Sequence, residues 1–334
     1  MSIFAPTSLD KFLNKTRLSW TWFVVLVGIV LFILPLLVAF ADGFIHEFLY
    51  EGVWRTMYMA PALLVYILAL QRPMDVALER AVLALRKIIL LDDDAFEKIV
   101  LEASEVDARG ELLAFLLGAA FGFWSNGPWT IEGDYQWLKI FFPLAGALLW
   151  GTLSWVIYSS VASTKLQSIL HQQPMKFDIF NLRPFEPFGR FGLFMALAFV
   201  GGLIISALFI NPLANESIIF PLTLYAILAT VTVFVFFLSM RDTHKVLSAE
   251  KKRAIELAEL KISEAFQSLS GGTISSGDMV SASTELNLWL KYEARLKVAR
   301  TWPYNTAMIR TLALSILLPA TVSLLQRLLA NILS

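Results

Sequence analysis

Residues 20–41 read WTWFVVLVGIVLFILPLLVAFA, a stretch without any charged side chain. A helix needs about 20 consecutive apolar residues to cross a bilayer, because its backbone N–H and C=O groups must pair within the segment. This stretch therefore predicts a transmembrane helix. Lys11, Lys15 and Arg17 precede it, as in a secretory signal, but the apolar run is long enough to be retained as a first span.

Six further apolar segments follow, and together they predict an all-α, polytopic transmembrane helix bundle of about seven spans. The segment 111–129 is the weakest, since the turn signal from Ser125 to Pro128 interrupts it, and it either tilts through the bilayer or re-enters. Arginines in two of the others lie near the ends, where they can reach the headgroups. The predicted segments are 53–70, 111–129, 138–162, 191–210, 218–240 and 306–333.

The placement of basic residues predicts the orientation of these spans. Cytoplasmic loops retain Lys and Arg. With the N-terminus inside and seven spans, the cytoplasmic segments hold 23 of the 27 basic residues, and the C-terminus lies outside. The cytoplasmic segments are then 1–19, 71–110, 163–190 and 241–305.

Two water-exposed regions complete the predicted organisation of domains. Within the bundle of residues 1–240, Pro73 opens a pair of cytoplasmic amphipathic helices over 73–109. Residues 241–303 predict a cytoplasmic antiparallel helical hairpin, because a Gly/Ser turn at 271–277 separates two helical patterns. The second helix has a heptad-like apolar seam, typical of a coiled coil.

Several short motifs resemble a family of uncharacterised bacterial multi-pass membrane proteins. They are the run Leu90–Phe96 with its three aspartates, the Phe- and Pro-rich elbow Phe177–Arg190, and the pairs Thr243, His244 and Trp302, Pro303. The resemblance covers most of the chain. It implies a multi-pass protein of the bacterial inner (cytoplasmic) membrane and no catalytic activity.

Composition excludes several function classes. The chain is 57% hydrophobic and 16% charged, its net charge is zero and it has no cysteine. Zero net charge gives no reason to expect nucleic acid as a partner, and the missing cysteines exclude thiolate metal sites. His46, His171 and His244 stand singly, and no catalytic motif is present. We therefore predict no enzyme activity, catalytic residue, cofactor or metal.

Small and hydroxyl residues within the spans suggest sites of other kinds. Small residues at a spacing of four allow helices to approach closely. Hydroxyls at mid-membrane depth either bond their own helix or line a polar path. The small residues are Gly118, Gly122, Ala147, Gly151, Ala198, Gly202 and Ser206. The candidate pore-lining hydroxyls are Thr152, Ser154, Thr223, Thr230 and Thr232.

Two functions remain. The first is a homo-oligomeric ion channel or passive pore, with the hairpin as a gate or assembly element and an acidic outer mouth. The second is a non-transporting scaffold or sensor that binds a partner through residues 241–303. Both imply the lipid bilayer as surroundings, and the first implies self-association. The candidate mouth residues are Asp42, Glu47, Glu51, Glu132, Asp134 and Glu216.

Overall fold

The computed structural model describes residues 3–5, 8–105, 107–209, 219–270 and 276–333. Within these ranges the chain is helical, which confirms the all-α prediction, and Ile89 and Met175 form an isolated antiparallel bridge. The elements are α1 (Ser8–Thr16), α2 (Trp20–Ala41), α3 (Ile45–Tyr50), α4 (Val53–Arg86), α5 (Asp93–Ser104), α6 (Ala108–Ser125), η1 (Pro128–Thr130), α7 (Gln136–His171), η2 (Arg183–Phe185), α8 (Glu186–Phe209), α9 (Ile219–Ser239), α10 (Arg241–Ser270), α11 (Ser276–Val298) and α12 (Thr306–Leu333).

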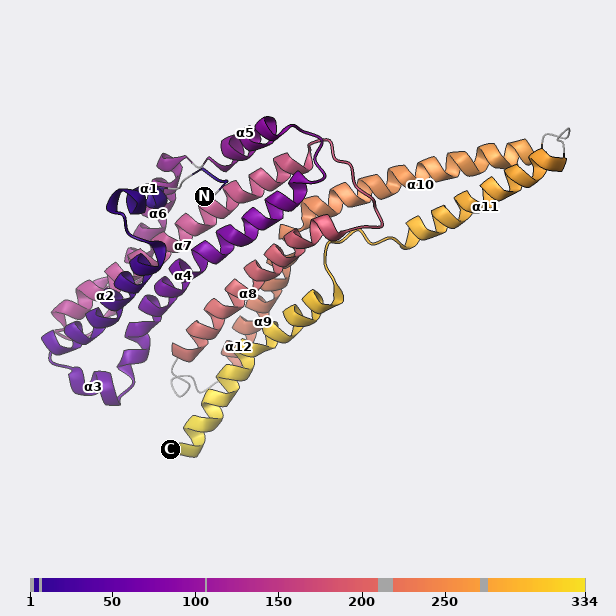
Figure 1. Ribbon diagram of the computed structural model, residues 1–334. Coiled ribbons are helices and arrows are strands. Elements are labelled where there is room, and N and C mark those ends of the chain that lie inside the picture. Colours follow the sequence, from indigo (N-terminus) through magenta and orange to yellow (C-terminus); the bar gives the residue numbers. More distant parts are fainter. Residues whose placement is uncertain (1–2, 6–7, 106, 210–218, 271–275, 334) are drawn as a thin grey trace.

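Five helices, α2, α4, α7, α8 and α12, are long and apolar enough to cross a membrane. Their apolar side chains face outward to a large extent; Val30 of α2, for example, is 63% exposed. A soluble protein rarely leaves so much apolar surface in contact with water, whereas lipid requires no polar covering. The five helices lie in one bundle, in which α4 packs against α2, α7 and α8, and α8 packs against α12 (Figure 1).

The predicted boundary near residue 70 is wrong, because α4 runs without interruption from Val53 to Arg86. Pro73 lies inside this helix and does not open a new one. A proline inside a helix costs about 3 kcal/mol. Burial offsets that cost, since Leu78, Val82 and Leu85 of the second half of α4 are buried in a core shared with α5, α7 and α8.

The third predicted span, 111–129, differs from the structure. Here α6 ends at Ser125 and the short helix η1 follows. With 18 residues, α6 is about 27 Å long, somewhat less than a hydrocarbon core of about 30 Å, and it is not among the five helices above. Within α9, which corresponds to the predicted span 218–240, the apolar stretch Ala229–Ser239 is shorter than the five helices above.

The Phe-rich elbow Phe177–Arg190 is partly buried and runs into α8. Phe185 of η2 and Phe188 of α8 are fully buried in the same core as Leu85. The N–H of Leu90 donates to the carbonyl of Pro174, and the N–H of Lys176 donates to that of Ile88. These contacts hold the segment after α7 against the end of α4, and α8 begins at Glu186, five residues before the predicted 191.

Helices α10 and α11 lie side by side and extend away from the bundle (Figure 1). We call this pair the arm. Lys251 Nζ donates to the carbonyl oxygens of Lys297 and Ala299, at 2.8 and 2.9 Å. Ile179 packs with Ala258 and Leu296, so the segment before α8 supports the arm.

Candidate functional site

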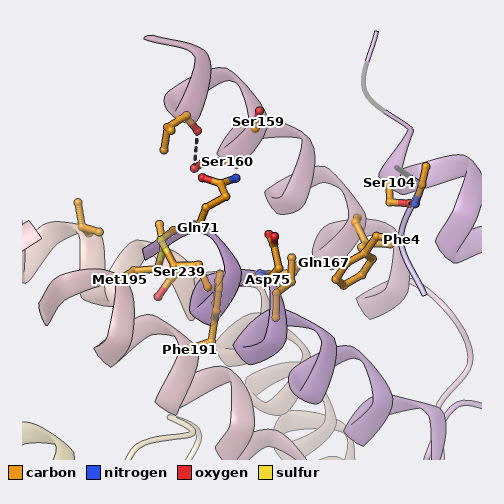
Figure 2. A pocket seen from close by; sticks show the side chains of 16 residues that line it. Phe4, Gln71, Asp75, Ser104, Ser159, Ser160, Gln167, Phe191, Met195 and Ser239 are labelled. Carbon is orange, nitrogen blue, oxygen red and sulfur yellow. Dashed lines mark hydrogen bonds between the residues drawn. The ribbon is translucent and has the colours of Figure 1, made fainter. Parts of the chain in front are cut away.

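A cavity of about 140 Å³ with a mixed lining lies between α4, α7, α8 and α9, and Phe4 and, from α5, Ser104 also line it (Figure 2). Apolar side chains such as Leu78 and Phe191 form part of its wall. Gln71 and Asp75 project from α4 toward the serines of α7 (Figure 2). The polar side chains that line it are Gln71, Asp75, Ser104, Ser159, Ser160, Gln167 and Ser239.

Hydroxyl groups in this cavity bond to their own helices. Ser160 Oγ donates to the carbonyl of Val156 at 2.8 Å, and Ser239 Oγ donates to that of Phe236 at 2.8 Å (Figure 2 shows the former). A hydroxyl that donates in this way still presents oxygen lone pairs. The volume has room for several water molecules, so the cavity can hold water or a small polar ligand.

The structure does not bring the candidate pore-lining hydroxyls to one surface. Thr152 lines a separate, mostly apolar cavity between α2, α4, α6 and α7. Ser154 lies beside Gly118 of α6. Thr230 is exposed and donates to the carbonyl of Ala226, whereas Thr232 is fully buried. The side chain of Thr223 lies outside the described residues.

Five of the six candidate mouth residues lie in two segments that meet. Asp42, Glu47 and Glu51 follow α2, and Glu132 and Asp134 precede α7. The segments are joined at Asp42, whose carboxylate accepts hydrogen bonds from the backbone N–H groups of Trp137 and Leu138 at 3.0 and 2.8 Å. Asp42 therefore caps the start of α7. Glu216 lies outside the described residues.

The small residues predicted at 118 and 122 lie in a close contact between α6 and α7. A Cβ at Gly118 would overlap the carbonyl oxygen of Trp150, and one at Gly122 would overlap that of Gly146. Gly151 of α7 lies against the ring of Phe115 on α6. Ala147, beside Gly146 on α7, is half-buried.

Near the predicted small residues of α8, a tight contact falls at Gly201, one residue before Gly202. A Cβ at Gly201 would overlap the hydroxyl of Tyr66, whereas a Cβ at Gly202 would lie 3.8 Å from Tyr66 Cε1, an ordinary contact. The Tyr66 hydroxyl donates to the carbonyl of Ala198 at 2.8 Å. Ser206 Oγ donates to the carbonyl of Gly202 at 2.9 Å.

Sequence reasoning missed a buried polar contact at the base of the arm. His171, the last residue of α7, and Thr243 of α10 are both buried. His171 Nδ1 lies 2.7 Å from the carbonyl oxygen of Gln167, and Nε2 lies 2.8 Å from Thr243 Oγ1. Since a carbonyl only accepts, Nδ1 donates to it, and neutral Nε2 accepts from the threonine hydroxyl. This contact ties α10 to the bundle, and no sequence spacing indicates it.

His244, the residue after Thr243 on α10, stacks against Trp302. The ring of His244 lies parallel to that of Trp302, with centroids 4.0 Å apart, and His244 Nδ1 is 3.1 Å from the carbonyl oxygen of Thr301. Trp302 precedes α12. The start of the arm is thus held both to the end of α7 and to the segment that leads into α12.

The outer faces of the arm carry large apolar side chains that are open to the surroundings. Leu257 and Leu260 of α10 are 51% and 62% exposed, and Leu288 of α11 is 64% exposed. Residues three apart in a helix lie on one face, as Leu257 and Leu260 do. The hydrogen bonds of Lys251 set a register in which Leu288 is level with Leu260. Further exposed residues are Phe266, Met279, Val280, Leu290 and Val298.

Neither a metal site nor a known relative identifies the function of the described residues. Among the described residues, no group of three or more His, Cys, Asp or Glu side chains is placed to hold a metal ion. No protein family, no curated protein and no solved structure matches the chain.

Proposed function

We propose that the chain is an integral membrane scaffold of the bacterial inner membrane, with seven spans and the N-terminus inside, which binds a helical protein partner through the arm. The observation that carries the proposal is the set of large apolar side chains exposed on the arm, Leu257, Leu260 and Leu288. They belong to helices that extend away from the bundle. Contiguous apolar patches outside the membrane mark protein interaction sites, and Leu257 and Leu260 share one face of α10.

The attachment of the arm supports the same role. Thr243 and Leu247 at its start are buried against the bundle, and Arg295 lies over the ring of Phe180 at 4.8 Å. A binding element held at its base presents its surface with less loss of entropy than a loose segment. The basic residues of 241–305 favour the cytoplasmic side.

Site-specific photocross-linking in intact cells tests the arm. A photoreactive side chain at position 260 is expected to form one discrete adduct, and the same side chain at Glu259, also exposed but on another face, is expected to form none. The triple variant Leu257→Gln, Leu260→Gln and Leu288→Gln removes the apolar contacts with little loss of helix propensity. With the photoreactive side chain moved to Lys261, the triple variant is expected to reduce the adduct at least about tenfold.

The mass of the adduct identifies the partner. Twice the mass of the chain indicates a second copy, and any other mass a different protein. A discrete adduct that the glutamine substitutions remove supports the scaffold. Equal labelling from positions 259 and 260, or no adduct from either, contradicts it.

A homo-oligomeric pore is the second candidate, and the polar side chains in the cavity between α4, α7, α8 and α9 favour it. Polar side chains among spans can form part of a water-filled path. The test is current across a planar bilayer in asymmetric salt. For a pore, Glu47→Gln with Glu51→Gln is expected to shift the reversal potential away from cation selectivity, whereas Asp42 is left intact because it caps α7.

Discrete current steps that a protein-free control lacks would establish conduction. An unchanged reversal potential in the double variant would remove the two glutamates from the mouth. A silent bilayer from well-folded, monodisperse protein would contradict the pore at the voltages applied and leave the scaffold.

A further inference from the structure

The mostly apolar cavity between α2, α4, α6 and α7 has a volume of about 490 Å³. Cavities that bind small ligands measure roughly 300–1,000 Å³. Leu112 lines this cavity and is 59% exposed, so the cavity opens toward the surroundings of the spans. It is therefore accessible from the side, where lipid surrounds the bundle.

One carboxylate lines this mostly apolar space. Glu111, in the first turn of α6, is only 4% exposed. Trp155 Nε1 donates a hydrogen bond to Glu111 Oε1 at 3.1 Å. A buried carboxylate needs hydrogen-bond donors or opposite charges beside it, and Glu111 lies at the positive end of the α6 dipole.

The polar groups gather at one end of the cavity. Glu111 and Trp155 lie where α6 begins, whereas Leu31, Phe115 and Leu148 line the other end. From Phe23 to Leu31 along α2 the wall measures about 12 Å. Thr152 lies between the two ends. The cavity thus has a negative, hydrogen-bonding end and a long apolar end. A lipid fits this arrangement when its headgroup lies beside the start of α6 and its acyl chain lies at the apolar end.

We propose that this cavity binds one acyl chain of a lipid whose headgroup is a primary ammonium, as in an ethanolamine phospholipid. Glu111 accepts hydrogen bonds from the ammonium group, and the apolar end takes the chain. A primary ammonium has N–H donors for the carboxylate, whereas the trimethylammonium of a choline lipid has none. The site does not depend on the arm.

Native mass spectrometry of the full chain tests this site. The protein is mixed with equal amounts of two phospholipids that have identical chains and carry ethanolamine or choline headgroups. The wild-type protein is expected to retain the ethanolamine lipid about tenfold more strongly, equivalent to about 1.4 kcal/mol. Glu111→Gln is expected to abolish the preference. Glu105→Gln is the matched control, since Glu105 is exposed and is expected to leave the preference unchanged.

Fluorescence provides a second measurement that leaves the carboxylate intact. Ethanolamine lipids with brominated chains are expected to quench tryptophan emission more in the wild type than in Trp155→Phe, because Trp155 lines the cavity. Equal retention of both lipids by the wild type, or a preference that persists in Glu111→Gln, would overturn the proposal. So would quenching that is identical with and without Trp155.

Discussion

Replacement of Gly122 by alanine is expected to lower the free energy of unfolding by about 3 kcal/mol. A Cβ at this position would overlap the carbonyl oxygen of Gly146 and lie 2.6 Å from its carbonyl carbon. Both atoms belong to the backbone of α7, so no change of rotamer relieves the overlap. The two helices must move apart, and the contacts between α6 and α7 weaken along their length.

Gly202→Ala is the matched control. Alanine has a helix propensity about 1 kcal/mol better than that of glycine at both positions, and a Cβ at Gly202 meets nothing closer than Tyr66 Cε1 at 3.8 Å. The difference between the two variants therefore isolates the packing. Equilibrium unfolding in mixed micelles, followed by circular dichroism, measures both. Equal stability of the two variants would mean that α6 and α7 are not in close contact.

Truncation of Phe188 to alanine is expected to cost about 4 kcal/mol. Its side chain is fully buried in the core that α4, α5, α7 and α8 share. The variant leaves a cavity beside Leu85, which the backbone cannot close without a shift of α8. The effect extends to the arm, because the ring of Phe188 lies edge-on against His171, with centroids 5.2 Å apart, and His171 accepts from Thr243.

Two measurements check this second prediction. Equilibrium unfolding gives the loss of stability, with Phe234→Ala as the control because Phe234 is 64% exposed on α9 and is expected to cost less than about 1 kcal/mol. Hydrogen exchange over Arg241–Leu247 is expected to accelerate in Phe188→Ala and not in the control. Exchange that stays at the wild-type rate would show that the base of the arm is held independently of Phe188.

The sequence predicts the apolar helices well, because a long run of apolar residues by itself indicates a helix surrounded by lipid. Residues 20–41 coincide with α2, 138–162 fall within α7, and 191–209 of the predicted segment 191–210 lie in α8. The predicted positions of the helix ends are less accurate. The prediction of a new helix at Pro73 failed because a proline is a local signal, whereas the burial of Leu78 and Val82 that sustains α4 depends on partners more than 80 residues away, such as Leu166 and Phe188.

The candidate sites show the same limit. The spacing of Gly118 and Gly122 indicates close packing, but nothing in it identifies α7 as the partner helix. Asp42, predicted as part of a mouth, caps a helix 95 residues later in the chain. Glu111 and Trp155 are 44 residues apart, and only the packing of α6 on α7 brings them together. Each of these contacts is long-range, so local patterns carry no trace of it.

The charges along α10 have a consequence for how the arm stands over a membrane. Five basic and two acidic residues occupy 241–253, whereas three acidic and one basic residue occupy 254–270. Its 30 residues measure about 45 Å, several times the screening length of about 8 Å at physiological salt. On α11, a hydrogen bond to Glu293 raises the pKa of Lys297, a further cation near the base of the arm. For the orientation that we propose, with the base of the arm at the cytoplasmic leaflet, anionic lipid attracts the base and repels the far end, which favours an upright arm whose exposed leucines lie clear of the headgroups.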